Sequence, residues 1–167
     1  MTDDRHAEWA AAARRLPRGS VVVIRGRDSD ARAGLFEALR AVPHLRLLVA
    51  DDPVLAARAD GLHLPETRLC EAPHWRAMRP DWIITASAHS LAALLRAREL
   101  DAVFLSPVFA TASHPGASWL TPARAAFIAA ASPVPVYALG GVMARNAALL
   151  APSFDGIAAI SSLLSAP

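Results

Sequence analysis

The chain has 167 residues, 54% of them hydrophobic, and because its 17 basic residues are all arginine and are nearly balanced by acids, the formal net charge is only +2. This length and composition predict one domain over 1–167 with a core that needs no disulfide or metal ion. They exclude a membrane span, a nucleic-acid-binding basic run and lysine Schiff-base chemistry, and since the N-terminus does not resemble a signal peptide, we expect a cytoplasmic location.

Strand patterns and helical patterns alternate along the chain. In chain order, we expect a helix over 6–16, a strand over 20–25, a helix over 31–41, a strand over 46–50, a short helix over 53–59, a strand over 61–64, and an irregular segment over 65–80, which holds three prolines. The order continues with a strand over 82–87, a helix over 90–100, a strand over 102–106, a helix over 121–132, a strand over 134–140, a helix over 143–150 and a strand over 156–160.

Seven short apolar strands separated mostly by helices are typical of a parallel sheet that helices cover. Two closures are compatible with this order, a (β/α)₈ barrel and an open doubly wound sheet. No glycine-rich nucleotide-binding motif follows the first predicted strand, which weakens the open-sheet alternative. A barrel usually takes about 200 residues or more, so we expect a minimal one.

Polar residues and glycines follow nearly every predicted strand. In parallel α/β folds these strand ends meet at one edge of the sheet, where functional groups collect. The residues expected there are Arg25, Arg27, Asp51, Asp52, His63, Glu66, Ser87, His89, Ser106, Thr111, Ser113, His114, Gly140, Gly141, Ser161 and Ser162. Together they predict a polar site at the carboxyl edge of the sheet.

Three features suit the binding of an anion. Gly140 and Gly141 end a strand just before a helix, so backbone N–H groups there could approach a phosphate closely, although a glycine pair alone is more often only a tight turn. The segment 158–162 leads from a strand into small hydroxyl residues, and with the glycine pair it matches a recurrent phosphate site on the last two strands of barrels. Arg25 and Arg27 could face a pyrophosphate together, or lie at a solvated strand end.

Other residues have both a functional and a structural interpretation. Asp51 and Asp52 could hold Mg²⁺, but Asp52 is better explained as the cap of the helix that Pro53 begins. His63 lies between two leucines, where a structural histidine is more common than a catalytic one. His89 is either a site residue or the neighbour of a helix start.

Five segments carry a family likeness: they read, in order, LLVADDPVLAARADGLHLPE, TASAHS, DAVFLSPVFATASHPGA, PVYALGGV and DGIAAISSLL. Together they resemble the thiamine-phosphate synthase family and its thiazole tautomerase relatives over most of 20–163. Members of that family are (β/α)₈ barrels. The resemblance implies a transferase of thiamine biosynthesis that joins aminopyrimidine methyl pyrophosphate to thiazole phosphate, with Mg²⁺ helping pyrophosphate to leave.

The resemblance also implies roles for single residues. Thiazole phosphate would bind at Gly140, Gly141, Ile160 and Ser161. Pyrophosphate would bind at Arg25, Arg27, Thr111, Ser113 and His114. Ser87 matches a family serine, and we predict Ser87 and His89 as the catalytic residues.

The chain departs from the family pattern at the metal corner. Asp51 is kept, but Ala50 replaces the polar residue beside it, and Arg68 stands where the family has a second Mg²⁺ carboxylate. Glu66 is the nearby substitute. We therefore predict a weakened Mg²⁺ site formed by Asp51 and Glu66.

The two ends of the chain are short against the family pattern. We expect a barrel whose first strand and last helix are truncated, with the gap covered either by a partner chain in a homodimer or by the N-terminal segment. Two other functions stay open. One is a thiazole phosphate tautomerase-like enzyme with His89 or His63 as proton carrier, and the other is a non-catalytic barrel that binds thiamine precursors.

Overall fold

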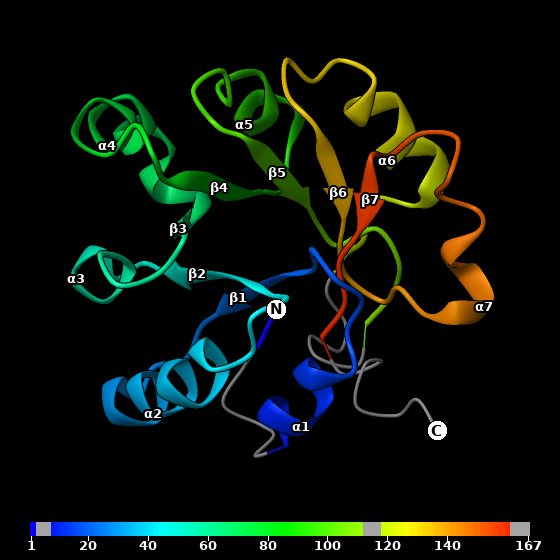
Figure 1. Ribbon diagram of the computed structural model, residues 1–167. Helices are drawn as coiled ribbons and strands as arrows, with labels where there is room; N and C mark the ends of the chain where they lie inside the picture. Colours follow the sequence, from blue (N-terminus) through cyan, green and yellow to red (C-terminus); the bar gives the residue numbers. More distant parts are fainter. Residues whose placement is uncertain (3–7, 112–117, 161–167) are drawn as a thin grey trace.

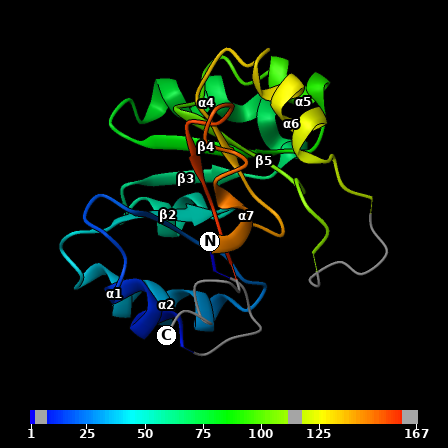
Figure 2. The same cartoon turned by 90° about the vertical axis from the view of Figure 1, so that its right-hand side faces the viewer.

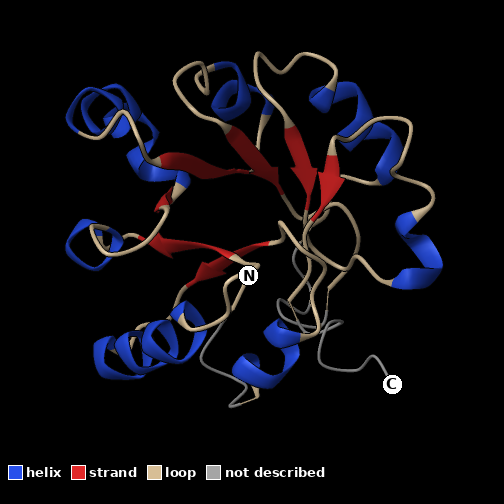
Figure 3. Ribbon diagram, in the orientation of Figure 1, coloured by secondary structure: helices blue, strands red, loops and turns tan. Residues whose placement is uncertain are grey.

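The computed structural model describes residues 1–2, 8–111 and 118–160. Across this described part, seven parallel strands form one sheet in sequence order from β1 to β7. The sheet curls into a half-barrel with helices around its outside (Figures 1 and 3). Because the strand order never reverses, this is the TIM-type arrangement and not the open doubly wound sheet. The strands are β1 (Val21–Ile24), β2 (Arg46–Ala50), β3 (Gly61–Leu64), β4 (Ile83–Ala88), β5 (Ala102–Leu105), β6 (Val136–Ala138) and β7 (Gly156–Ile157).

The helices are short. In the view of Figure 2, α1 and α2 lie below the curled sheet, and α5 and α6 lie above it. In the described ranges none is long and apolar enough to cross a membrane. Side chains of Asp28, Asp52, Ser90 and Thr121 accept backbone hydrogen bonds at the starts of α2, α3, α5 and α6. The helices are α1 (Trp9–Arg14), α2 (Ser29–Arg40), α3 (Pro53–Ala56), α4 (Ala72–Met78), α5 (Leu91–Leu95), α6 (Pro122–Ala129) and α7 (Ala144–Ala147), with the 3₁₀ helix η1 (Glu66–Glu71).

The prediction of an irregular segment over 65–80 is wrong, because η1 and α4 occupy most of it. The prolines that suggested an irregular segment lie at the boundaries of these helices. Pro65 directly precedes η1, Pro73 lies in the first turn of α4, and Pro80 follows its end. A proline at a helix start costs no hydrogen bond, since the N–H groups of the first turn have no partner within the helix.

Apolar side chains cover both faces of the strands. Successive residues of β1 and β2 alternate between two clusters, so that Val23 and Leu48 point inward while Ile24 and Val49 point to the helices. Burial on both faces explains why the strands are continuous apolar runs in the sequence. The inner cluster consists of Met1, Val23, Leu48, Phe104 and Leu139.

Met1 and Thr2 lie between the two edges of the curled sheet. The main-chain nitrogen of Thr2 donates to the Val23 oxygen at 2.9 Å, and that of Met1 donates to the Ala159 oxygen at 3.1 Å. The Thr2 hydroxyl accepts from the N–H of Arg25 at 2.9 Å and donates to its carbonyl oxygen at 3.1 Å. Both residues are buried. Part of the gap is therefore filled by the N-terminal segment, one of the two alternatives that the sequence left open.

Replacing Thr2 with valine tests this closure. The variant keeps the side-chain shape but removes the hydroxyl from the N–H and C=O of Arg25, so we expect the free energy of unfolding to fall by about 2 kcal/mol. Urea titration followed by circular dichroism measures the loss. Thr67→Val, at an exposed position of η1, is the matched control, and equal effects of the two substitutions would contradict the closure.

Candidate active site

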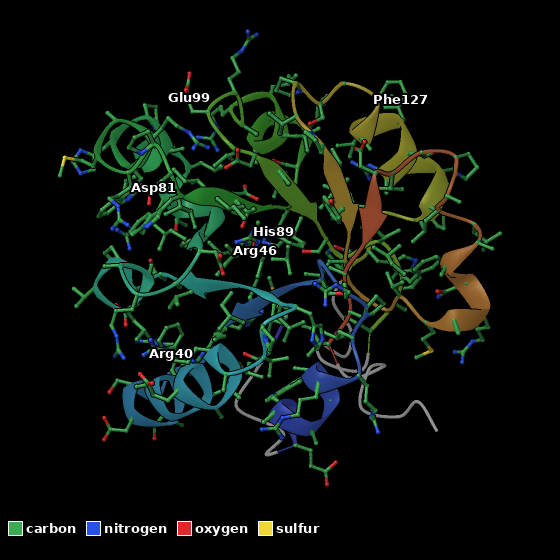
Figure 4. All side chains as sticks on the ribbon, in the orientation of Figure 1. Arg40, Arg46, Asp81, His89, Glu99 and Phe127 are labelled. Carbon is green, nitrogen blue, oxygen red and sulfur yellow. The ribbon has the colours of Figure 1, made fainter. Side chains whose placement is uncertain are left out.

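A cleft of about 870 Å³ opens at the carboxyl ends of the strands, a volume in the range of small-molecule sites. Figure 4 places His89 near the middle of the curled sheet, whereas Glu99 and Phe127 lie at its rim. The loops after the strands bring most of the predicted residues together in this cleft. Those that line it are Arg25, Arg27, Asp51, Glu66, Ser87, His89, Thr111, Gly140 and Ile160.

Four predicted residues are not part of the described lining. Ser113, His114 and Ser161 lie outside the residues that the structure describes. Gly141 is described but does not line the cleft. The cleft is also lined by residues for which the sequence predicts no binding or catalytic role in the leading function: Gly26, Arg32, Ala50, His63, Pro65, Ser106, Pro107, Ser118 and Leu139.

The basic side of the cleft comes from the end of β1 and the first turns of α2. Arg32 reaches back from α2, and its Nη1 donates to the Gly26 carbonyl oxygen at 2.8 Å. Its Nη2 pairs with Asp52 at 2.7 Å. Arg32 therefore ties the loop that carries Arg25 and Arg27 to the start of α3. Sequence reasoning missed it because it lies within a helix and not at a strand end.

Both carboxylates predicted to hold a metal ion already have other partners. Asp51 has a left-handed backbone conformation, with φ at 57°, and its Oδ1 accepts a hydrogen bond from Nη1 of Arg68. Arg68 also donates through Nε and Nη2 to the two carboxylate oxygens of Glu71, each at 2.6 Å. These hydrogen bonds, with Glu71 first and Asp51 second, raise the pKa of Arg68. Glu66 Oε2 accepts from the backbone N–H of His89 at 2.6 Å.

These contacts do not fit a magnesium site. Mg²⁺ requires near-octahedral oxygen ligands, whereas Asp51 already faces a permanent guanidinium charge. Within the described ranges, no three acidic, histidine or cysteine side chains lie close enough to share an ion. Asp52 caps α3 by accepting from the N–H of Leu55 at 2.9 Å, as predicted. The Asp51–Glu66 metal site stays a prediction that the geometry does not favour.

A buried histidine supports Ser87. Nδ1 of His63 lies 2.9 Å from Oγ1 of Thr85, and Nε2 lies 3.0 Å from Oγ of Ser87. Phe104 packs edge-on against the ring, with the centroids 5.3 Å apart. Burial lowers the pKa of His63 to about 3, and the positive charge of Arg25 adds to this effect. The ring is therefore neutral at physiological pH, with one nitrogen donating and the other accepting.

This environment limits what Ser87 can do. An imidazole with so low a pKa takes up a proton poorly, so His63 cannot activate Ser87 as a nucleophile near neutral pH. Ser87 is instead a half-buried hydroxyl held at the cleft by hydrogen bonding. The sequence indicated a structural histidine at position 63, and His63 is indeed buried. Its contact with Ser87 was not predicted. That contact depends on the register of β3 and β4, which sets His63 opposite Thr85.

His89 presents one ring nitrogen for a ligand. Its Nδ1 lies 2.8 Å from the carbonyl oxygen of Ser106. Because a carbonyl oxygen can only accept, Nδ1 carries the hydrogen, and Nε2 is the acceptor in the neutral ring. Ser106 is buried at the end of β5. The exposed ring of His89 is therefore held in a defined orientation at the cleft.

The glycine pair after β6 is required by the packing of a neighbouring loop. Gly140 has φ at 92°, and a Cβ there would lie 2.8 Å from Cα of Pro107. Gly141 has φ at 66°, and a Cβ there would lie 2.4 Å from the Ala110 oxygen. The loop after β5 is also bonded to this turn, since the N–H of Phe109 donates to the Gly140 oxygen at 3.1 Å. The turn thus has a structural reason for both glycines, in addition to any contact with a ligand.

The low pKa of His63 predicts a pH-dependent stability. The unfolded chain binds a proton near pH 6.5 and the folded protein only near pH 3, so stability is lost as the pH falls between these values. Compared with His63→Gln, the native protein should lose about 1.4 kcal/mol more per pH unit between about pH 5.5 and pH 4. Urea titrations at several pH values measure this difference. His74→Gln, an exposed histidine, should keep the native slope, and parallel slopes for His63→Gln and the native protein would contradict the prediction.

Comparisons with known proteins show the family of this chain. Residues 2–163 match the model of the family described as thiamine monophosphate synthase. A thiamine-phosphate synthase from Methanoculleus marisnigri is 39% identical over 120 residues, which cover 68% of this chain and 56% of that protein. A thiamine-phosphate synthase from Geobacillus kaustophilus is 30% identical over 155 residues, which cover 86% of this chain and 68% of that protein.

A solved structure shares the fold. Thiamine phosphate pyrophosphorylase from Pyrococcus furiosus superimposes with a TM-score of 0.75 at 23% identity, covering 99% of this chain and 86% of that one. The chain spans about half the length of several curated relatives that it matches. The family match nevertheless extends over nearly every described strand and helix. The chain belongs to the thiamine monophosphate synthase family.

Proposed function

We propose that this protein is a transferase that joins aminopyrimidine methyl pyrophosphate to thiazole phosphate, giving thiamine phosphate and pyrophosphate. One observation carries the proposal. The family match over residues 2–163 coincides with a cleft lined by several of the residues predicted to bind pyrophosphate and thiazole phosphate and by the two predicted catalytic residues.

The proposed reaction exchanges one bond for another. The C–O bond between the pyrimidine methylene carbon and pyrophosphate breaks, and its electron pair leaves with pyrophosphate. The thiazole nitrogen then donates its lone pair to the methylene cation, which forms the C–N bond of thiamine phosphate. This exchange needs no net proton transfer. It is therefore compatible with a site in which His63 is neutral and Ser87 is not activated.

The pyrophosphate would bind on the side of the cleft formed by Arg25 and Arg27. Guanidinium groups match phosphate oxygens in geometry, and they stabilise the negative charge that develops as the C–O bond breaks. Thr111 lines the same cleft from the loop after β5. In this proposal Ser113 and His114, outside the described residues, complete the pyrophosphate contacts.

The pyrimidine ring would lie against the end of β4. There Ser87 provides a hydroxyl and His89 provides Nε2 as an acceptor, and both groups are held by the contacts with His63 and Ser106. The ring of aminopyrimidine methyl pyrophosphate carries an amino donor and nitrogen acceptors that these two groups complement. Ser87 and His89 would orient the methylene carbon toward the thiazole.

The thiazole phosphate would bind at the ends of β6 and β7. Gly140 and Ile160 line the cleft there, and we assign them to the phosphate with Gly141 and Ser161. The tight turn at the glycine pair brings backbone close to the cleft, as phosphate binding by N–H groups requires. The packing of the loop after β5 keeps this turn in place.

No step of this mechanism is assigned to Mg²⁺, because Asp51 and Glu66 do not fit an ion in this arrangement. The tautomerase-like alternative has less support, since the family match carries the name of the synthase. His63 is also poorly suited to carry a proton near neutral pH, because burial lowers its pKa to about 3. The cytoplasmic location and the homodimer stay predictions.

Incubation of the protein with both precursors tests the function. We expect thiamine phosphate and pyrophosphate to form in equal amounts, because each C–O bond broken gives one C–N bond. Chromatography of thiamine phosphate and a coupled pyrophosphate assay measure the two products. Binding of thiazole phosphate without any product would favour the non-catalytic barrel and overturn the proposal.

Arg25→Gln should lower kcat/KM by about 100-fold, because it removes a positive charge from the departing pyrophosphate. The matched control is Arg46→Gln. Arg46 is the first residue of β2, at the opposite end of the strand from the cleft, and it forms an exposed pair with Asp60 at 2.8 Å. Surface pairs contribute little, so the control should stay within about twofold of the native protein. Comparable losses in both variants would remove Arg25 from the site.

A further inference from the structure

Arg68 brings a positive charge to a corner where the family resemblance implies a magnesium carboxylate. Its guanidinium bonds to Asp51, which with Glu66 provides the carboxylates in the described part of the cleft lining. A carboxylate at the wall of a cleft that takes a polyphosphate repels that ligand unless a cation accompanies it. Binding of an anion in the cleft therefore depends on whether a metal ion or Arg68 balances the charge of Asp51.

The orientation of the Arg68 guanidinium is set in advance. Nε and Nη2 form two parallel hydrogen bonds with Glu71 at 2.6 Å each. Glu71 is in turn held by Nε1 of Trp75, which donates to it at 3.1 Å. Such a fork fixes the plane of the guanidinium. Nη1 is left directed at Asp51.

Asp51 is held from its own side as well. Its backbone N–H donates to the carbonyl oxygen of His63 at 3.0 Å, which ties the end of β2 to β3. Arg68 comes from η1, directly after β3, and its N–H donates to the Pro65 oxygen at 2.9 Å. The ion pair thus joins two backbone segments that are each anchored to the sheet. A divalent cation bound to Asp51 would either displace the guanidinium from Oδ1 or lie beside its charge at the other carboxylate oxygen.

We propose that Arg68 replaces a divalent cation as the partner of Asp51, so that the cleft binds pyrophosphate without a metal ion. This inference rests on the proposed function, since it concerns the same leaving group. Arg25 and Arg27 also line the cleft and supply further positive charge for the anion. Arginine keeps its charge at any pH at which the protein is folded, so this arrangement needs no metal supply.

Calorimetric titration with inorganic pyrophosphate, in EDTA and in MgCl₂ with correction for magnesium pyrophosphate, tests the inference. The native protein should bind in EDTA with a Kd within about threefold of that in MgCl₂. Arg68→Asp should bind at least about tenfold more weakly in EDTA and regain affinity in MgCl₂. A direct Mg²⁺ titration should show tighter binding by Arg68→Asp than by the native protein. Native binding that is more than about tenfold tighter with MgCl₂ would overturn the inference.

Two further variants keep the test decisive. Arg68→Gln removes the charge without adding a third carboxylate beside Asp51 and Glu71, and it should also weaken binding in EDTA. Arg58→Gln breaks an exposed pair with Glu37 on the outer surface and should bind like the native protein. Equal affinities in EDTA for Arg68→Gln and Arg58→Gln would contradict the assignment of Arg68.

The outcome is separable from that of the proposed function. Metal-free pyrophosphate binding without formation of thiamine phosphate would leave the inference standing and reject the function. Formation of thiamine phosphate that stops in EDTA, together with pyrophosphate binding that requires MgCl₂, would reject the inference and leave the function standing.

Discussion

Parallel pairing of the strands is the constraint on which the rest of the structure depends. Because each strand pairs with the next in sequence order, all the strands end at the same edge and their following loops converge there. Apolar side chains on both faces make the sheet rigid, and the polar residues are left at the strand ends. The parallel hydrogen bonding between strands therefore places the cleft at this edge of the sheet. Met1 and Thr2 contribute by joining β1 to the segment after β7.

Within the cleft, buried neutral groups position exposed polar ones. His63 contacts Thr85 and Ser87, and Ser106 holds the ring of His89. These contacts link β3 to β4 and β4 to β5, so the orientation of each candidate catalytic side chain depends on the register of two strands. Hydrogen bonds of this kind orient substrates, and they suit a reaction in which no side chain has to remove a proton.

Arginine side chains make the charged contacts at the corner formed by the ends of β2 and β3. Every cation there is a guanidinium, which is planar, permanently charged and able to bond two carboxylates at once. Arg68 bonds the carboxylates of Asp51 and Glu71, while Arg32 bonds the Gly26 carbonyl oxygen and the carboxylate of Asp52. The same residue type thus serves both as an anion-binding group and as the support of the loops that carry other anion-binding groups.

The sequence by itself determined the local features: the apolar strand runs, the cap at Asp52, and the presence of polar residues after the strands, including Arg25, Ser87 and His89. Local patterns suffice for these because each depends on neighbours in the chain. It misjudged 65–80, where prolines that look like helix breakers lie at helix boundaries. Only the tertiary structure decided the partners of His63 and Arg32 and the contact of Arg68 with Asp51. Those contacts join segments about 20 residues apart, and they follow from strand register and loop path. Because both faces of these strands are apolar, no alternation of apolar and polar residues marks their register in the sequence.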